Sequence, residues 1–581
     1  MATAKRRLTT QMKKTLNIRK NRFLLNRAVA VFSFLQLCGL QAFGADLTGI
    51  NFPRAGETVE VLVQYANRPT QDQHRRVASR GGRVRASFEH FSMAHYDVSP
   101  EALVNLASDP DVVAIHPNRS VSAFIDHAMN SANYTPLWVQ NINTKHPAAA
   151  GIGVAILDSG IDPGHPNFDK YQTSTSRIVY SETFVGGDTN DEFGHGTHVA
   201  GIAVGVDNIT WSLPNVNRNF YGVAQAANIV NLKVLDANGN GTDASVIAGI
   251  NRAIQLKNTY NIRVMNLSLG RPVATSYKSD PLCQAVEAAW KAGIVVVVAA
   301  GNSGRDNSLG TQGYGTITAP GNDPYVITVG AANDKADFTR ANDVIATYSS
   351  KGPTAIDHIV KPDLVAPGNR VVSAQSSVSA LPNQYPGNEI PIYTYDPNGS
   401  AANSPYYFTL SGTSMATPVV TGAAAMLIDR NSAITPDQVK AKLMLTAWRG
   451  FPATMSTTVT DPATNVTATY TANHDLFTIG AGQLDIWAAY NDTSMPTGSA
   501  ASPSASFNSS KKTVSLQLNS TSAKNVVWGT TSPYATNVVW GTNVSGTNVV
   551  WGTNVVWGTN VVWGTGQAAV ESTSIAINGE N

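Results

Sequence analysis

Five short stretches of the chain are apolar throughout, and segments of helical periodicity separate them. The stretches are residues 154–158, 229–235, 263–269, 293–300 and 325–331. A strand without polar alternation is buried on both faces, so these stretches predict a mainly parallel sheet covered by helices. Between two of them, residues 244–256 keep Val246, Ile250 and Ala253 on one helical face. The sequence therefore predicts an α/β domain of three layers, in which reactive side chains collect at the carboxyl ends of the strands.

The remainder of the 581-residue chain divides into shorter segments. Residues 45–124 alternate strands and helices in the order β-α-β…α-β, which predicts a small ferredoxin-like unit. We expect the α/β domain over residues 125–490. Residues 491–524 are rich in Ser, Thr, Pro and Asn, which indicates a linker. In the tail, residues 525–581, the sequence Asn-Val-Val-Trp-Gly-Thr occurs five times.

Residues 1–44 have the pattern of an export signal, whether translation starts at Met1 or Met12. A basic region precedes the apolar run 28–40 and a small-residue cleavage site, and the run is too short to anchor the protein in a bilayer. The chain carries a formal net charge of +2 and this leader carries +9, so the rest carries −7. Without a basic stripe we expect no nucleic-acid partner. The pattern predicts a secreted or extracellular protein, with retention at the cell surface left open.

Cys283 is the only cysteine that remains after the leader is removed, so an intramolecular disulfide is excluded. It shares one face of a predicted helix with Val286 and Trp290. Asp280 is the expected cap of this helix and Gly293 its end. We expect a buried, unreactive thiol.

Four motifs carry groups that a serine hydrolase would need. Asp158 ends the first apolar strand in DSGID, His195 opens HGTHVAG, Asn302 lies in AAGNSG, and Ser414 opens a small-residue helix in SGTSMATP. Serine acyl transfer requires a nucleophile, a base and an orienting carboxylate, together with donors for an oxyanion. Each motif alone is weak, because a serine at this place is also a common helix cap. The histidine pair of HGTHVAG could suggest a metal, but no third ligand follows at a recognisable spacing.

In this order and over about residues 130–490, the four motifs resemble the subtilisin-like serine peptidases, the subtilase family. The resemblance implies that Asp158 orients the general base His195 and that Ser414 is the nucleophile. It implies an oxyanion site formed by the Asn302 amide and the backbone N–H of Ser414. The expected function is that of an exported serine endopeptidase, a monomer that hydrolyses protein or peptide substrates through an acyl-enzyme.

The resemblance also implies a zymogen, in which residues 45–124 are an inhibitory propeptide. We expect the maturation cut between Phe124 and Ile125, because Phe124 is the only large aromatic residue in the stretch 118–130 that follows the last predicted strand of this unit. The tail is expected to be dispensable for catalysis, since the catalytic motifs are complete without it. A non-enzymatic surface protein that acts through the tail is the competing hypothesis. An acid peptidase of the sedolisin type is disfavoured, because His195 stands where that group carries an acid.

Two segments match those that bind substrate as an added strand in the family, and a third lines the first pocket. Their residues are Ser268, Leu269, Gly270, Ala299, Ala300, Gly301 and Thr318. The pocket residues are small and include no acid. We therefore expect broad selectivity, with a preference for large apolar or aromatic residues before the scissile bond.

The chemistry implied by the resemblance requires no cofactor. Structural calcium is compatible with the family, but Asn167 stands where its tighter calcium site begins with a carboxylate, so no metal residue is assigned. Residues 375–407 lengthen the connection before Ser414 and are expected to reshape the cleft. The loop 207–220 is also unusual for the family.

Overall fold

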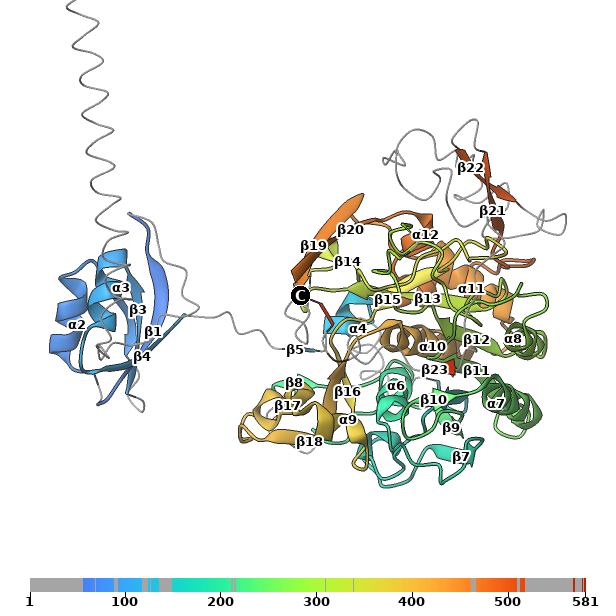
Figure 1. The fold of residues 1–581 in the computed structure, drawn as a ribbon. Helices are drawn as coiled ribbons and strands as arrows, with labels where there is room; N and C mark the ends of the chain where they lie inside the picture. The colour runs from blue at the N-terminus through green and yellow to red at the C-terminus, as the bar shows by residue number, and fades with distance from the viewer. Residues whose placement is uncertain are drawn as a thin grey trace, which may run out of the picture. The chain divides into compact units, whose positions relative to one another are not determined.

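A computed structural model of the protein describes most of the chain between residues 56 and 517 and a few residues of the tail. The described ranges are 56–117, 124–134, 149–508, 513–517, 568–569, 577 and 579–580, with gaps at 68, 88–91, 126, 211–212, 214–215, 309, 338 and 461–466. The export signal and the Trp-containing repeats predicted above lie outside these ranges. The chain separates into two compact units, Met1–Ser122 and Ala123–Asn581 (Figure 1).

The described residues of the first unit form a four-stranded antiparallel sheet with two helices. Its elements are β1 Val59–Tyr65, α2 Gln71–Ala78, β2 Arg83–Ser87, β3 Met93–Val98, α3 Pro100–Ala107 and β4 Val112–Pro117, and the strand order is β2-β3-β1-β4. Alternation in β1 buries Val61 and Val63, which pack in one core with Leu103 of α3. The sequence did not predict β2, a polar and largely exposed strand at the edge of the sheet.

The second unit is built on a central sheet in which the five predicted apolar strands lie side by side. Its order is β14 Val344–Ile345, β13 Ile327–Asn333, β12 Val295–Ala299, β11 Ile262–Leu267, β6 Gly153–Asp158, β9 Asn228–Lys233 and β7 Ile178–Thr183. β15, Leu364–Pro367, also pairs with β13. All these pairings are parallel except that of β14. The prediction of a mainly parallel sheet is confirmed.

Two groups of helices cover this sheet. One group consists of α7, Asp243–Leu256, and α8, Pro281–Lys291, which pack on each other and on β6, β11 and β12. The second group consists of α6, His195–Val204, and α10, Thr413–Arg430, which contact β6, β11, β12 and β13 (Figure 1). α11, Pro436–Leu445, packs beside α10. α10 is buried along almost its whole length because small residues bring it close to its neighbours. An added Cβ at Gly422 would lie 2.8 Å from the Ala203 carbonyl oxygen of α6.

α8 agrees with its sequence pattern. The Asp280 carboxylate accepts hydrogen bonds from the first backbone N–H groups of the helix, and Gly293 follows the helix at a φ of 85°. Cys283 is buried and its thiol contacts the side-chain oxygen of Asn322 at 3.2 Å. Burial raises the pKa of this thiol well above its usual value.

The structure differs from the predicted linker in residues 491–524. β21, Ser504–Asn508, and β22, Thr513–Gln517, form a hairpin there, and Ala505 and Val514 belong to the main core. The Pro503 carbonyl oxygen accepts from the backbone N–H of Val360 at 2.8 Å. The segment is poor in large apolar residues, so the pattern missed a hairpin that is held mainly by backbone hydrogen bonds.

The long connection before Ser414 forms a second, three-stranded antiparallel sheet of β16, Val371–Ala374, β17, Glu389–Pro391, and β18, Asn403–Leu410.

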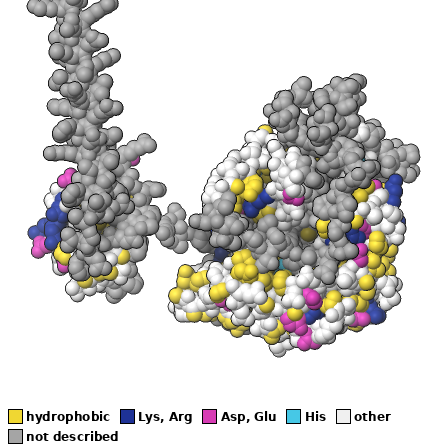
Figure 2. All heavy atoms as spheres, viewed as in Figure 1, with side chains coloured by type: hydrophobic (Ala, Val, Ile, Leu, Met, Phe, Trp, Pro, Cys, Tyr) yellow, Lys and Arg dark blue, Asp and Glu magenta, His cyan; other side chains and the backbone are white. Residues whose placement is uncertain are grey.

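On the face of the second unit drawn in Figure 2, the described Lys and Arg side chains are scattered among acidic and uncharged ones. Within the described residues, no helix is both long enough and apolar enough to cross a membrane.

Candidate active site

The four predicted catalytic residues lie at the starts of two helices and near the ends of two sheet strands. Asp158 is the last residue of β6, and Asn302 follows β12 by three residues. His195 begins α6, and Ser414 is the second residue of α10, which packs against α6. Ser268, directly after β11, contacts Ser414 at the same edge. Because parallel strands end at one edge of a sheet, this topology gathers the residues there.

Asp158 and His195 form a buried pair. The Nδ1 atom of His195 lies 2.7 Å from Oδ1 of Asp158, and each side chain is only 1% exposed. The same carboxylate oxygen accepts from the backbone N–H of Ser159 at 2.8 Å. A carboxylate acceptor places the ring proton on Nδ1, so Nε2 carries the basic lone pair of the neutral imidazole.

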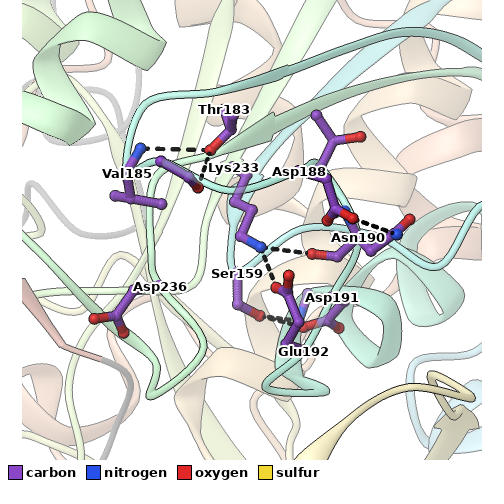
Figure 3. A network of polar contacts seen from close by, with 12 residues as sticks. Ser159, Thr183, Val185, Asp188, Asn190, Asp191, Glu192, Lys233 and Asp236 are labelled. Carbon is purple, nitrogen blue, oxygen red and sulfur yellow. Dashed lines mark hydrogen bonds and ion pairs between the residues drawn. The ribbon is translucent and has the colours of Figure 1, made fainter.

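A second carboxylate, Asp191, fixes the start of α6 (Figure 3). It accepts from the backbone N–H groups of Gly194 at 2.7 Å and Thr197 at 2.8 Å, and from the Ser159 hydroxyl at 2.8 Å. These donors include helix N–H groups that have no partner within the helix. Burial raises the pKa of Asp191, and the backbone hydrogen bonds from Thr197 and Gly194 act against this rise. Sequence reasoning missed this residue, because it lies three positions before Gly194, the N-cap of α6, and so outside the usual capping pattern.

The loop that carries Asp191 is held by Lys233 (Figure 3). This lysine ends β9 with its side chain buried, and its ammonium group donates to the Asn190 carbonyl oxygen at 2.7 Å and pairs with Glu192. A buried ammonium needs such partners to offset the loss of its hydration. Lys233 therefore ties the loop before His195 to the central sheet.

Ser414 is fully buried, and its hydroxyl donates to the Ser268 carbonyl oxygen at 2.9 Å. In return, the Ser268 hydroxyl donates to the Ser414 carbonyl oxygen at 2.8 Å. Gly412 precedes the helix at a φ of 143° and donates its N–H to the Gly368 carbonyl oxygen at 2.7 Å. That backbone conformation favours glycine. These contacts fix the position of Ser414 at the N-terminus of α10.

The orientation of the Asn302 side chain follows from its contacts with Thr413. Its Oδ1 accepts from the backbone N–H of Thr413 at 3.0 Å and from the Thr413 hydroxyl at 3.1 Å. A backbone N–H can only donate, so Oδ1 faces Thr413 and the amide nitrogen faces the other way. This Nδ2 is buried and has no hydrogen-bond partner among the described residues. A buried donor without a partner is costly, and it is suited to an anion that forms only during a reaction.

The structure brings the three predicted substrate segments together around Thr318. A Cβ added at Gly270 would lie 2.5 Å from Oγ1 of Thr318, and one added at Gly301 would lie 2.8 Å from its Cγ2. The backbone N–H of Thr318 donates to the Ala300 carbonyl oxygen at 3.1 Å. These close approaches explain why both positions are glycine. The binding of substrate by these residues stays a prediction.

His198 is set apart from this arrangement. Its side chain is buried, and its Nε2 lies 3.1 Å from the Val371 carbonyl oxygen and 3.0 Å from that of Phe408. Burial and the nearby charge of His195 lower the pKa of His198 to about 3, so it is neutral near pH 7. A neutral ring that donates to two carbonyl groups is a structural link between β16 and β18.

Asn167, which stands at the start of the family's tighter calcium site, is also held by protein groups. Its amide nitrogen donates to the Tyr407 hydroxyl at 3.3 Å, and the same hydroxyl donates to Asp207 at 3.2 Å. The Asp207 carboxylate also accepts from the backbone N–H groups of Thr210 and Phe220. Among the residues that the structure describes, no group of three or more His, Cys, Asp or Glu could hold a metal ion.

A serine, an imidazole and a carboxylate gathered at one edge of a sheet are typical of serine peptidases. Residues 149–482 match the model of the subtilase family, and this match covers more than half of the chain. The chain therefore belongs to the subtilase family and is a subtilisin-like serine peptidase.

Two relatives identified by sequence support the assignment. The chain is 36% identical over 372 residues to serine protease AprX of Bacillus subtilis (strain 168), covering 62% of this chain and 75% of that protein. It is 32% identical over 382 residues to subtilisin E of the same strain, covering 64% and 79% of the two chains. A solved structure of a cold adapted subtilisin-like serine proteinase shares 29% identity, covers 52% of this chain and 83% of its own, and has a TM-score of 0.36.

Proposed function

We propose that this protein is an exported serine endopeptidase that hydrolyses peptide bonds through Ser414, His195 and Asp158. The observation that carries the proposal is the buried contact of 2.7 Å between His195 Nδ1 and Asp158 Oδ1, which leaves the basic lone pair of the ring at Nε2. The chemical class rests on family membership. One relative, an extracellular serine proteinase of Thermus sp. (strain Rt41A) that is 32% identical over 355 residues, supports export.

The roles rest on the resemblance to the family and on the requirements of acyl transfer. His195 Nε2 takes the proton of the Ser414 hydroxyl as Oγ bonds to the substrate carbonyl carbon, and Asp158 stabilises the imidazolium that forms. The oxygen of that carbonyl becomes an oxyanion and accepts from Asn302 Nδ2 and the backbone N–H of Ser414. His195 then gives its proton to the leaving amine. A water molecule hydrolyses the acyl-enzyme with the same base.

The test compares hydrolysis of a short peptide by the mature protein with that by Ser414→Ala and His195→Ala. Each variant should lose nearly all activity, because the three groups act as a unit and one loss costs about as much as all. Ser279→Ala is the matched control, since this serine is exposed and distant in sequence from the catalytic motifs. Activity retained in Ser414→Ala would overturn the proposal.

Selectivity for a large apolar residue before the scissile bond rests on the small side chains around Thr318. Ala299 and Ala300 are buried, and neither they nor Thr318 carries a charge that could pair with a basic substrate residue. Peptides that differ only at this position should be cut faster with Phe or Leu than with Arg or Glu. Equal or faster cleavage after Arg would contradict the pocket assignment.

The first unit is proposed to be the inhibitory propeptide. Its element order β-α-β-β-α-β and its strand order support a ferredoxin-like fold. The proposed cut between Phe124 and Ile125 falls in β5, Phe124–Ile125, which pairs in parallel with β8, Arg218–Asn219. The pairing between β5 and β8 must therefore break before Ser414 can cleave this bond.

A further inference from the structure

Glu580, in the tail, is buried in the second unit although the residues that hold it lie more than 200 positions away in the sequence. Its carboxylate pairs with the Arg305 guanidinium at 2.9 Å and accepts from the Asn333 amide at 3.3 Å. It also accepts from the backbone N–H of Thr347 at 3.0 Å and from the hydroxyl of the same residue. Glu580 itself is 3% exposed. These donors form a site that is complementary to a carboxylate in charge and geometry.

The backbone around Glu580 is recognised as well. The Asn369 side chain donates to the Glu580 carbonyl oxygen at 2.6 Å and accepts from the Glu580 N–H at 2.8 Å. Gly579 has a φ of 56°, and an added Cβ would lie 2.4 Å from the Ser411 hydroxyl oxygen. The Asn388 side chain donates to the Ile577 carbonyl oxygen at 2.6 Å. The Glu580 side chain, the backbone on either side of it and the glycine before it each make a specific contact with the second unit, as the residues of a bound peptide do.

The tail contacts the second unit at another point. β23, Ala568–Ala569, pairs in antiparallel fashion with β10, Asn240–Gly241, and Figure 1 shows the two labels together. β10 directly precedes α7, whose first residue Asp243 pairs with Arg271 at 2.7 Å. Arg271 follows the predicted substrate segment 268–270. An extended segment added to a strand edge is a common way to bind a peptide.

Both contact points adjoin the catalytic residues. Ser411, which limits the space around Gly579, precedes Ser414 by three residues, and Asn369 follows Gly368, the acceptor of the Gly412 N–H. At the other point, an added Cβ at Gly239 would lie 2.7 Å from the ring of Phe193, two residues before His195. One contact is thus made beside the serine motif and the other beside the histidine motif.

We propose that the end of the tail, held through Ala568–Ala569 and through Glu580, acts as an intramolecular ligand that competes with peptide substrates for the cleft. The carboxylate site of Arg305, Asn333 and Thr347 is its latch and selects an acidic side chain. The inference rests on the proposed peptidase function. A ligand attached to its own receptor has a high effective concentration, so even a weak contact raises the apparent KM without changing kcat.

The first experiment measures KM, kcat and thermal stability of the mature protein with its complete tail. Glu580→Gln keeps the shape of the side chain and removes its charge, so KM should fall several-fold while kcat stays unchanged. Glu287→Gln is the matched control, because it is the same substitution at a glutamate that also forms an ion pair, with Lys291 of α8, and it should leave KM as in the wild type. An unchanged KM together with a lower Tm in Glu580→Gln would mean a structural clamp only and would overturn the proposal.

The second experiment needs no catalysis and so separates this inference from the proposed function. Ser414→Ala and Ser414→Ala with Glu580→Gln are first freed of the propeptide by an unrelated protease at an engineered cleavage site after residue 124. A fluorescent synthetic peptide of residues 566–581 is then added to each protein. Binding should be several-fold tighter to the second protein, whose own tail is released. A probe with Gln in place of Glu580 should bind at least tenfold more weakly. Equal binding by both proteins, or by both probes, would refute the latch even if the enzyme is active.

Discussion

The side-chain oxygen of Asn302 accepts a hydrogen bond of 3.0 Å from the backbone N–H of Thr413, the residue directly before Ser414. The contact joins the end of β12 to the start of α10, so the same hydrogen bond positions the helix and orients the amide. The donor Nδ2 is thereby set for an oxyanion before any substrate binds. Such preorganisation lowers the barrier, because no group has to reorient during the reaction.

Substitution of Asn302 tests the contribution of its amide donor. Asn302→Asp keeps an oxygen for Thr413 and loses the donor, whereas Asn302→Ala loses both. Each variant should have a kcat about 10²–10³-fold lower with little change in KM, a magnitude known from subtilisin itself rather than calculated for this site. Steady-state kinetics on a short peptide measure it. Turnover by Asn302→Ala at the wild-type rate would remove Asn302 from the oxyanion site.

The protein should tolerate removal of the residues that follow β22, but it should not tolerate removal of the hairpin of β21 and β22. A chain that ends at Tyr490 loses Ser502, which contacts the buried Lys440 and Asp363, and it loses the backbone acceptor of Val360. Each unmet buried group costs about 1–3 kcal/mol. We expect this truncation to deplete the soluble protein and a truncation after Gln517 to leave it soluble and active. Comparison of the soluble yields and melting temperatures is the measurement, and equal behaviour of the two truncations would contradict this account of the hairpin.

Ionisation of Asp343 should lower the free energy of unfolding as the pH rises from about 4 to about 6. It is buried, accepts from the Ser131 hydroxyl at 2.6 Å and from Gln483 at 2.7 Å, and burial raises its pKa to about 6. The folded state therefore binds the proton more tightly than the unfolded state, where the pKa is about 4, and stability is lost as pH rises through this range. The loss is at most about 3 kcal/mol.

Asp343→Asn keeps an oxygen acceptor and cannot ionise, so its stability relative to the wild type should increase by about 2–3 kcal/mol between pH 4 and pH 7. Denaturant unfolding at both pH values checks this. Parallel pH profiles of the two proteins would show that Asp343 does not titrate as expected.

Maturation should place Ile125 at the amino terminus of the mature enzyme, within a few residues. The reason is that a propeptide of this kind leaves its last residues in the cleft as product, and Phe124 suits the pocket proposed around Thr318. Amino-terminal sequencing measures the site, and the Ser414→Ala precursor, uncut except for signal removal, is the control. A mature enzyme that begins before Asp109 or after Trp138 would show that the boundary is misplaced.

The central strands could be predicted from sequence because burial on both faces leaves continuous apolar runs, as in β12. β2 and the hairpin of β21 and β22 could not, since a half-exposed edge strand and a hairpin held by backbone hydrogen bonds leave little apolar pattern. The sequence motifs identified Asp158 and His195 as catalytic candidates, and the structure places the two side chains in contact. The orientation of Asn302 depends on Thr413, which lies 111 positions away. The site for Glu580 depends on donors from four separate segments of the chain. Such long-range contacts have no local signal.

The most direct test of the account is covalent labelling of the mature protein by a fluorophosphonate, with the modified residue mapped by mass spectrometry. A serine becomes reactive toward this reagent only when a base takes its proton and the oxyanion site is formed. The account predicts one modified residue, Ser414, and loss of labelling in Ser414→Ala and in His195→Ala. A folded mature protein that is not labelled, or that is labelled at another serine, would contradict it.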